Sequence, residues 1–159
     1  MAAVKAALRV AVVANGDIDS PEKARRVLDY TKADALMIGR AAQGRPWIFR
    51  ELAHFLATGE HLAAPKTAEA GAWLAEHLHD HYRLYGEDDG VRSARKHIGW
   101  ALRELPGGEA FRAEMNTIDD CAQQVAAVGG WFARLAEDHE RLPREVALAA
   151  NDERIELSA

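Results

Sequence analysis

Residues 10–17 read Val-Ala-Val-Val-Ala-Asn-Gly-Asp, an apolar and mostly β-branched run that stops at a glycine. A short, continuous apolar run of this kind is typical of a strand buried on both faces, as in a parallel sheet. Residues 35–38, Ala-Leu-Met-Ile, form a second such run that stops at Gly39. Because helix signals lie between the two runs, the pattern predicts a β-α-β unit of a parallel α/β fold.

The helix between the two strands has a clear start at Ser20-Pro21-Glu22. These residues combine a hydroxyl N-cap, a proline at the first helical position and a carboxylate in the first turn. The helix then carries an apolar stripe at helical spacing, formed by Ala24, Val27 and Leu28. A further helix is expected over residues 46–56, ended by Thr58-Gly59.

From about Pro65 the chain reads as helices throughout. Thr67 is expected to cap a helix that runs to Tyr85, and residues 86–90 are expected to interrupt it. The next helix is indicated by an apolar stripe, formed by Val91, Ala94, Ile98, Ala101, Leu102 and Leu105. Two more helices are expected over residues 109–115 and from a capping box at residues 117–120 onward.

The predicted fold class is therefore α/β plus all-α. Residues 1–64 hold the βα units, residues 65–142 form a small helical bundle, and residues 143–159 form a flexible acidic tail. The first part carries 9 Lys/Arg against 7 Asp/Glu, whereas residues 65–159 carry 11 against 18. The chain has 159 residues, which is too short for a complete eight-stranded β/α barrel of about 250 residues.

Composition excludes several classes of protein. The net charge of −5 argues against a uniformly basic nucleic-acid binder, although a local basic patch remains compatible with it. The single cysteine, Cys121, excludes an intrachain disulfide and a four-cysteine zinc site. No apolar run approaches 18 residues and no secretory signal is evident, so we expect a cytoplasmic protein with no membrane partner.

Two glycine-bearing segments follow the predicted strands, and they carry the strongest indication of a ligand. In parallel α/β sheets ligands bind at the carboxyl ends of strands, where glycine lets the backbone approach a phosphate. Arg40 adds a guanidinium that could contact a phosphate with two hydrogen bonds. The alternative, in which Gly16 and Gly39 only make turns, has equal weight on spacing alone.

A longer pattern is more specific. Residues 12–18, Val-Val-Ala-Asn-Gly-Asp-Ile, and residues 33–49, Ala-Asp-Ala-Leu-Met-Ile-Gly-Arg-Ala-Ala-Gln-Gly-Arg-Pro-Trp-Ile-Phe, resemble the bacterial tRNA-dihydrouridine synthases, and in particular their B-type subfamily. Residues 92–100, Arg-Ser-Ala-Arg-Lys-His-Ile-Gly-Trp, are similar to that family's helical domain, and the segments 111–112 and 116–118 fit the next part of that domain. The resemblance covers about residues 4–136 in sequential order.

The resemblance implies an FMN-binding (β/α)8 barrel followed by a helical tRNA-binding domain. The family reduces uridine in tRNA to dihydrouridine, with NADPH as the reductant of the flavin. Residues 1–64 would correspond to the last two βα units of the barrel. The family's FMN-phosphate positions would fall on Asn15, Gly16, Asp17, Gly39 and Arg40.

The family's catalytic motifs are missing from the chain. Neither the Asn-x-Gly-Cys-Pro motif with the active-site cysteine nor the His-x-Arg-Thr motif occurs, and the family's flavin-contacting lysine lies upstream of the matched region. We therefore assign no catalytic residue and expect the chain to be inactive alone. A non-catalytic RNA-binding module and a truncated remnant are the alternatives. Uncovered barrel strands would also favour self-association.

The helix over residues 91–105 has a basic side next to its apolar stripe. The resemblance favours tRNA contact by five residues of this side, Arg92, Arg95, Lys96, Trp100 and Arg103. Lysine and arginine suit the phosphate backbone, and an aromatic ring suits a stacked base or ribose. The alternative is an ordinary solvated face, with the tryptophan packed on another helix.

Other candidate sites have ordinary explanations. His77 and His81 are four residues apart and share a helix face, but no third ligand stands at motif spacing, so no metal site is assigned. Cys121 lies on an apolar stripe and is interpreted as a packed structural thiol. Trp47 and Phe49 are expected to pack where the barrel segment meets the helical bundle.

Overall fold

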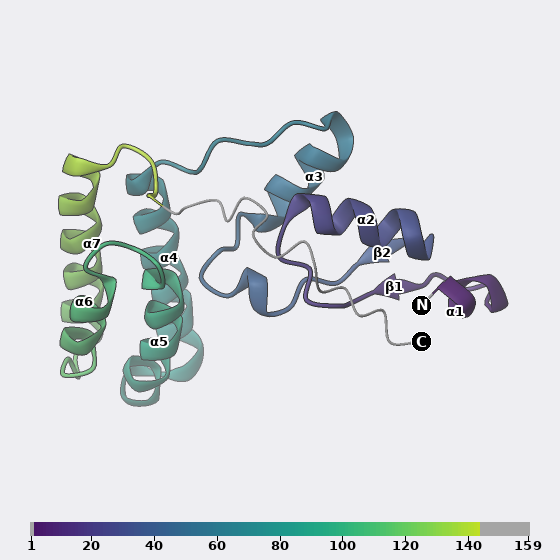
Figure 1. Ribbon diagram of the computed structural model, residues 1–159. Coiled ribbons are helices and arrows are strands. Elements are labelled where there is room, and N and C mark those ends of the chain that lie inside the picture. The colour runs from purple at the N-terminus through teal and green to yellow at the C-terminus, as the bar shows by residue number, and fades with distance from the viewer. Residues whose placement is uncertain (1, 144–159) are drawn as a thin grey trace.

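A computed structural model describes residues 2–143, and this part of the chain is mostly helical with two parallel strands (Figure 1). In chain order its elements are α1 (Ala2–Ala7), β1 (Val13–Ala14), α2 (Pro21–Thr31), β2 (Ala35–Leu36), the short 3₁₀ helix η1 (Arg40–Ala42), α3 (Ile48–Thr58), α4 (Thr67–Tyr85), α5 (Glu87–Leu102), α6 (Gly108–Met115) and α7 (Cys121–Asp138). The expected acidic tail lies outside the described residues, except for Pro143.

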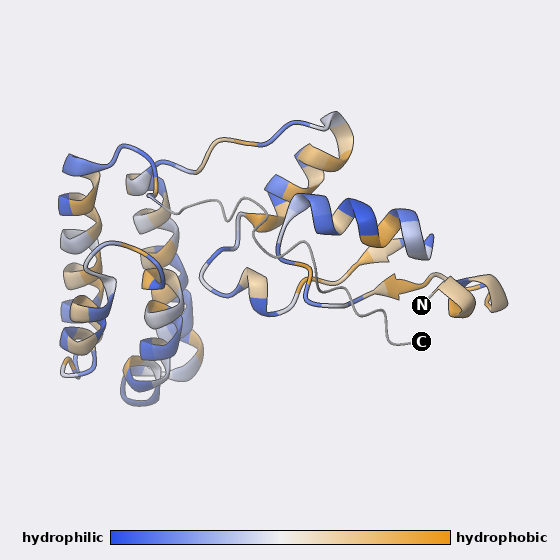
Figure 2. Cartoon of the chain, in the orientation of Figure 1, coloured by the Kyte–Doolittle hydropathy of each residue, from blue (hydrophilic) through white to orange (hydrophobic). Residues whose placement is uncertain are grey.

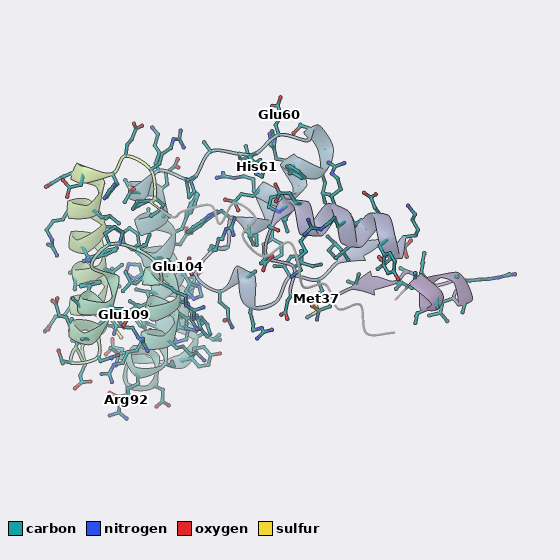
Figure 3. The ribbon with its side chains drawn as sticks, viewed as in Figure 1. Met37, Glu60, His61, Arg92, Glu104 and Glu109 are labelled. Carbon is teal, nitrogen blue, oxygen red and sulfur yellow. The ribbon has the colours of Figure 1, made fainter. Side chains whose placement is uncertain are left out.

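The two strands pair in parallel, with Val13 opposite Ala35 and Ala14 opposite Leu36. The parallel pairing follows the prediction, but the strands are shorter than the expected runs 10–14 and 35–38. They are also not buried on both faces: Ala14 is fully buried, whereas Val13 is 52% and Met37 54% exposed. The reason is that α2 and α3 pack against one side only, and Met37 lies away from both helices (Figure 3).

The local signals around α2 and α3 correspond to real helix ends. Ser20 is the N-cap of α2, and its hydroxyl accepts a hydrogen bond from the Lys23 amide at 3.4 Å. Gly59 ends α3 in the left-handed conformation, with φ of 81°. The helix is expected to start at residue 46, but α3 starts at Ile48. A turn precedes it, in which the Ile48 amide donates to the Arg45 carbonyl. Both strands are apolar in Figure 2, and α2 is mainly polar.

Several predicted boundaries in the helical half are wrong by a few residues, and one of them is the end of α5, which lies at Leu102 rather than at Leu105. Lys66, not Thr67, stands at the N-cap of α4, and the buried Thr67 hydroxyl donates instead to the His139 carbonyl at 2.6 Å. The break before α5 is Gly86 alone, since the helix begins at Glu87. Asp120, not Thr117, caps α7, with its carboxylate accepting from the Gln123 amide at 2.7 Å. Neither threonine takes the cap position that spacing predicts, because the Thr67 hydroxyl bonds a distant carbonyl and Asp120 caps α7.

Two apolar clusters form the core of the described residues. The smaller one lies between the strands, α2 and α3, and includes Ile18, Ala24, Ile48 and Leu52. The larger one joins α4, α5, α6 and α7. It contains most of the predicted apolar stripe of residues 91–105, in which Ile98 and Leu102 are buried. The domain boundary near residue 64 stays a prediction. No helix in residues 2–143 has the length and apolar character needed to cross a membrane.

The two clusters meet at a junction between the loop before α3 and the helices α4 and α5. Trp47 packs against the larger cluster, with its ring centre 5.9 Å from that of Trp73. The guanidinium of Arg50 lies over the Trp73 ring at 5.6 Å. The expectation for Trp47 is therefore confirmed. It is wrong for Phe49, which is 53% exposed because it lies on the outer side of α3.

Candidate functional site

The two glycine segments meet at one edge of the molecule. Parallel pairing of β1 and β2 brings both carboxyl ends to the same side, and the Met37 amide extends the pairing by donating to the Ala14 carbonyl at 2.8 Å. The five predicted phosphate-site residues follow directly, and all five are exposed: Asn15, Gly16, Asp17, Gly39 and Arg40. Tertiary structure therefore brings together two segments that are separate in sequence.

An ion pair joins these two segments. The Arg40 guanidinium donates to the Asp17 carboxylate, and this partner holds the pKa of Asp17 below its ordinary value. Asp17 itself adopts a positive φ of 48°, which turns the chain sharply after Gly16. The carboxylate therefore orients Arg40 across the strand ends.

The strand ends leave room for a ligand. A Cβ atom added to Gly16 or to Gly39 would meet no atom within 4 Å, so nothing in the described chain fills the space over either glycine. The Arg40 side chain is 79% exposed, and a guanidinium has five N–H donors, of which the ion pair uses only part. An exposed guanidinium beside open glycine backbone fits a phosphate group.

A second candidate surface runs along α5. On a helical wheel Arg92 and Lys96 point within about 40° of each other, and Arg103 stands at the C-cap of the helix; all three are exposed. Figure 3 shows Arg92 projecting from the end of the helical bundle. These three cations form the part of the predicted basic side that is free to meet a phosphate backbone.

The remaining two residues of the predicted basic side face inward. Arg95 is half-buried, and its guanidinium donates to the Asp119 carboxylate at 2.6 Å and to the Ile118 carbonyl at 3.1 Å. Trp100 is half-buried and meets the His97 ring edge-on, with ring centres 5.0 Å apart. Arg95 thus ties α5 to the segment before α7, and Trp100 belongs to the junction.

A cavity of about 180 Å³ lies at this junction. Its lining comes from both halves of the chain and includes Gly44, Trp47, Trp73, His77, His97 and Trp100. Neither this cavity nor the contact between His97 and His77 is predicted by the sequence patterns above. One signal is available: His77 on α4 and His97 on α5 are roughly equally far in sequence from the turn at Gly86. Residues at such positions face each other when two consecutive helices pack antiparallel.

The histidines at the junction are held in contact. His77 Nε2 lies 3.2 Å from His97 Nδ1, and His81 Nε2 lies 2.7 Å from the Ser93 hydroxyl. Burial, reinforced by His77, His81 and Lys96, lowers the pKa of His97 to about 4. Burial also lowers the pKa of His81. His81 and His97 are therefore neutral at pH 7.

Cys121 has the environment of a structural thiol. It is half-buried against the larger cluster, and its Sγ lies 3.5 Å from the Glu87 carbonyl. Burial, with nearby carboxylates, raises the pKa of the thiol. Because the thiolate is the reactive form, this environment disfavours a nucleophilic role.

Comparison with known proteins agrees with the pattern of residues. Residues 1–137 match the family model described as Dihydrouridine synthase (Dus). The tRNA-dihydrouridine synthase B of Pseudomonas aeruginosa is 56% identical over 133 residues, which are 84% of this chain and 40% of that protein. The Pseudomonas putida protein of the same name is 53% identical over 138 residues, covering 87% and 41%. The Salmonella typhimurium protein is 49% identical over 134 residues, covering 84% and 42%.

The match runs through both the glycine segments and the helical bundle. The chain spans about 40% of the length of these curated relatives. Since the family model matches residues 1–137, the chain belongs to the dihydrouridine synthase family and is a homologue of tRNA-dihydrouridine synthase B.

Proposed function

We propose that this chain supplies the FMN-phosphate site and the tRNA-binding surface of an enzyme that reduces uridine in tRNA to 5,6-dihydrouridine with NADPH. The observation that carries the proposal is the meeting of two open glycine segments with Arg40 at one strand edge. The names of the relatives give the reaction. Such a role belongs in the cytoplasm, where tRNA is found in bacteria.

Residues 1–64 are proposed to be the last two βα units of a (β/α)8 barrel. Their parallel strands, joined through α2, have the connectivity of such a unit. The uncovered strand side that carries Val13 and Met37 would then face the rest of a barrel. Residues 65–142 would form the tRNA-binding domain.

The strand-end residues are proposed to hold the phosphate of FMN. Backbone amides at Gly16 and Gly39 would donate to its oxygens, and Arg40 would neutralise its charge. Asn15 and Asp17 would shape the first segment, with Asp17 keeping Arg40 across the strand ends. Bound FMN would supply the hydride chemistry. These residues bind and orient, and none of them acts on a proton of the substrate.

The tRNA contact is proposed to lie on Arg92 and Lys96, which are exposed on one side of α5, and on Arg103, the exposed residue that follows its last turn. Arg95 and Trp100, which the sequence pattern places in the same group, would position α5 rather than contact the tRNA. Arg95 holds residues 118–119 against α5, and Trp100 holds α5 against the junction. The acidic remainder of the bundle would confine RNA to this side.

An FMN titration tests the phosphate site. We expect weak, saturable quenching of FMN fluorescence by the full chain, because the phosphate end alone is bound. Arg40→Ala should weaken the affinity by about tenfold or more, since a charge-assisted contact is lost. Arg83→Ala is the matched control, because Arg83 is also exposed and paired with a carboxylate, but on α4. Equal affinity for the two variants would remove the phosphate assignment.

A turnover assay tests the expectation that the chain alone is inactive. The chain contains none of the family's catalytic motifs, so with FMN, NADPH and unmodified tRNA it should form no dihydrouridine. Clear turnover would refute this part of the proposal. A second candidate function, RNA binding without chemistry, is favoured by the exposed cations of α5. It would be preferred if the chain bound tRNA but showed no FMN binding that depends on Arg40.

A further inference from the structure

Three histidines from two helices gather beside the junction cavity. His77 and His81 come from successive turns of α4, and His97 comes from α5. One ring nitrogen of each lies within 4.8 Å of the other two. We propose that these three imidazoles bind one divalent transition-metal ion, with Zn²⁺ as the ion that best suits the set. This inference is independent of the proposed function.

The spacing of the nitrogens suits tetrahedral coordination. Two nitrogens bound to Zn²⁺ at 2.0–2.1 Å in a tetrahedral arrangement lie roughly 3.3 Å apart. His77 Nε2 and His97 Nδ1 are already 3.2 Å apart. Without a metal, one of these atoms must carry the proton that bonds the other. Zn²⁺ would take the place of that proton, which would move through solvent to the other nitrogen of the same ring. The third nitrogen, within 4.8 Å of the other two, would have to move closer to reach the ion.

A hydrogen-bonded partner orients the buried member of the set. The Ser93 hydroxyl donates its single proton to the Asp89 carbonyl at 2.7 Å. Its oxygen also lies 2.7 Å from His81 Nε2, and it accepts a hydrogen bond there in the tautomer that carries the His81 proton on Nε2. In neutral His81 this leaves the lone pair on Nδ1. Metal-binding histidines commonly have such a partner on the nitrogen that does not bind the metal, and it sets the tautomer and ring orientation.

The remaining features of the site also suit an ion. His77 is exposed, so an ion can enter the site from solvent. Three protein ligands leave a fourth position for water. Because His77 and His97 line the junction cavity, that position has room in it. A bound ion would also join α4 to α5.

The test uses the full chain without affinity-tag histidines. Zn²⁺ is titrated against a chromophoric chelator, and Co²⁺ is then used as a spectroscopic probe. We expect one equivalent of Zn²⁺ per chain, a rise in Tm, and Co²⁺ bands typical of four-coordinate nitrogen and oxygen ligands. His77→Gln and His97→Gln should each weaken binding by at least about tenfold.

The matched control is His79→Gln. His79 is exposed on α4 between two members of the set but is not one of them, so its replacement should leave the affinity unchanged. Far-ultraviolet circular dichroism checks that the variants fold. If His97→Gln does not fold, His77→Gln still tests the site, because His77 is exposed and its replacement should leave the fold intact. Three results would overturn the site: no stoichiometric binding, equal affinity for wild type and His77→Gln, or a thiolate-to-cobalt band that places Cys121 among the ligands.

Discussion

Gly44 lies directly against the backbone of Trp100. A Cβ atom built on Gly44 would stand 2.2 Å from the Trp100 carbonyl oxygen, and Gly44 has a positive φ of 70°. Both facts require glycine, because no side chain fits the gap and left-handed backbone disfavours other residues. The loop before α3 and the end of α5 therefore approach through bare backbone, which sets how the two halves of the chain meet.

Gly44→Ala should destabilise the junction. The left-handed backbone costs about 1–2 kcal/mol, and overpacking against a rigid carbonyl adds about 1–3 kcal/mol. Urea unfolding followed by tryptophan fluorescence measures the loss. Gly59→Ala is the matched control, because Gly59 has φ of 81° but open space around it, so it bears only the backbone cost. Equal losses for the two variants would show that the contact with Trp100 has no energetic weight.

A buried hydrogen bond in the helical bundle should contribute measurably to stability. The Tyr82 hydroxyl donates to Gln124 Oε1 at 2.6 Å, and burial raises the pKa of Tyr82 above its ordinary value. Tyr82→Phe leaves the buried Gln124 oxygen without this donor, at a cost of about 1–3 kcal/mol. Tyr85→Phe should change the free energy of unfolding by less than about 0.5 kcal/mol, because Tyr85 is 56% exposed. Chemical denaturation of both variants measures the difference, and equal losses would contradict the prediction.

Neighbouring arginines of α5 should have separable roles. Replacing Arg92 and Lys96 together by alanine should weaken tRNA binding and make the negative slope of log K against log salt shallower by about 1.4–1.8, without changing Tm. Arg95→Ala should instead lower Tm, because it removes the contacts to Asp119 and to the Ile118 carbonyl. Filter binding at several salt concentrations, with calorimetry, distinguishes the two. An unchanged salt slope in the double variant would contradict the proposed tRNA surface.

The uncovered strand side should promote self-association. Val13 and Met37 are both more than half exposed next to the β1–β2 pair, and exposed apolar surface of this kind favours contact with another chain. Light scattering should show a mass that rises with concentration. Met37→Lys should reduce that rise, whereas Leu84→Lys, at a residue 75% exposed on α4, should not. A concentration-independent monomer would contradict this prediction.

Features set by neighbouring residues could be predicted from the sequence. The cap at Ser20, the stop at Gly59 and the buried stripe of α5 depend on contacts within a few residues, so spacing alone identifies them. The positions of Thr67 and Thr117 show where this reasoning fails. Thr67 bonds a carbonyl 72 residues away, and a better N-cap, Asp120, stands three residues beyond Thr117.

The same division applies to the candidate sites. By itself the sequence determined the family resemblance, the two glycine segments and the basic character of α5. Only tertiary structure decided that Arg40 pairs with Asp17, that Arg95 turns to Asp119 and that His97 meets His77. These partners are about 20 residues apart, and no helical or strand period connects them. They meet because strand pairing and helix packing bury apolar faces. Polar side chains at the edges of those faces are thereby brought close enough to form hydrogen bonds and ion pairs with one another.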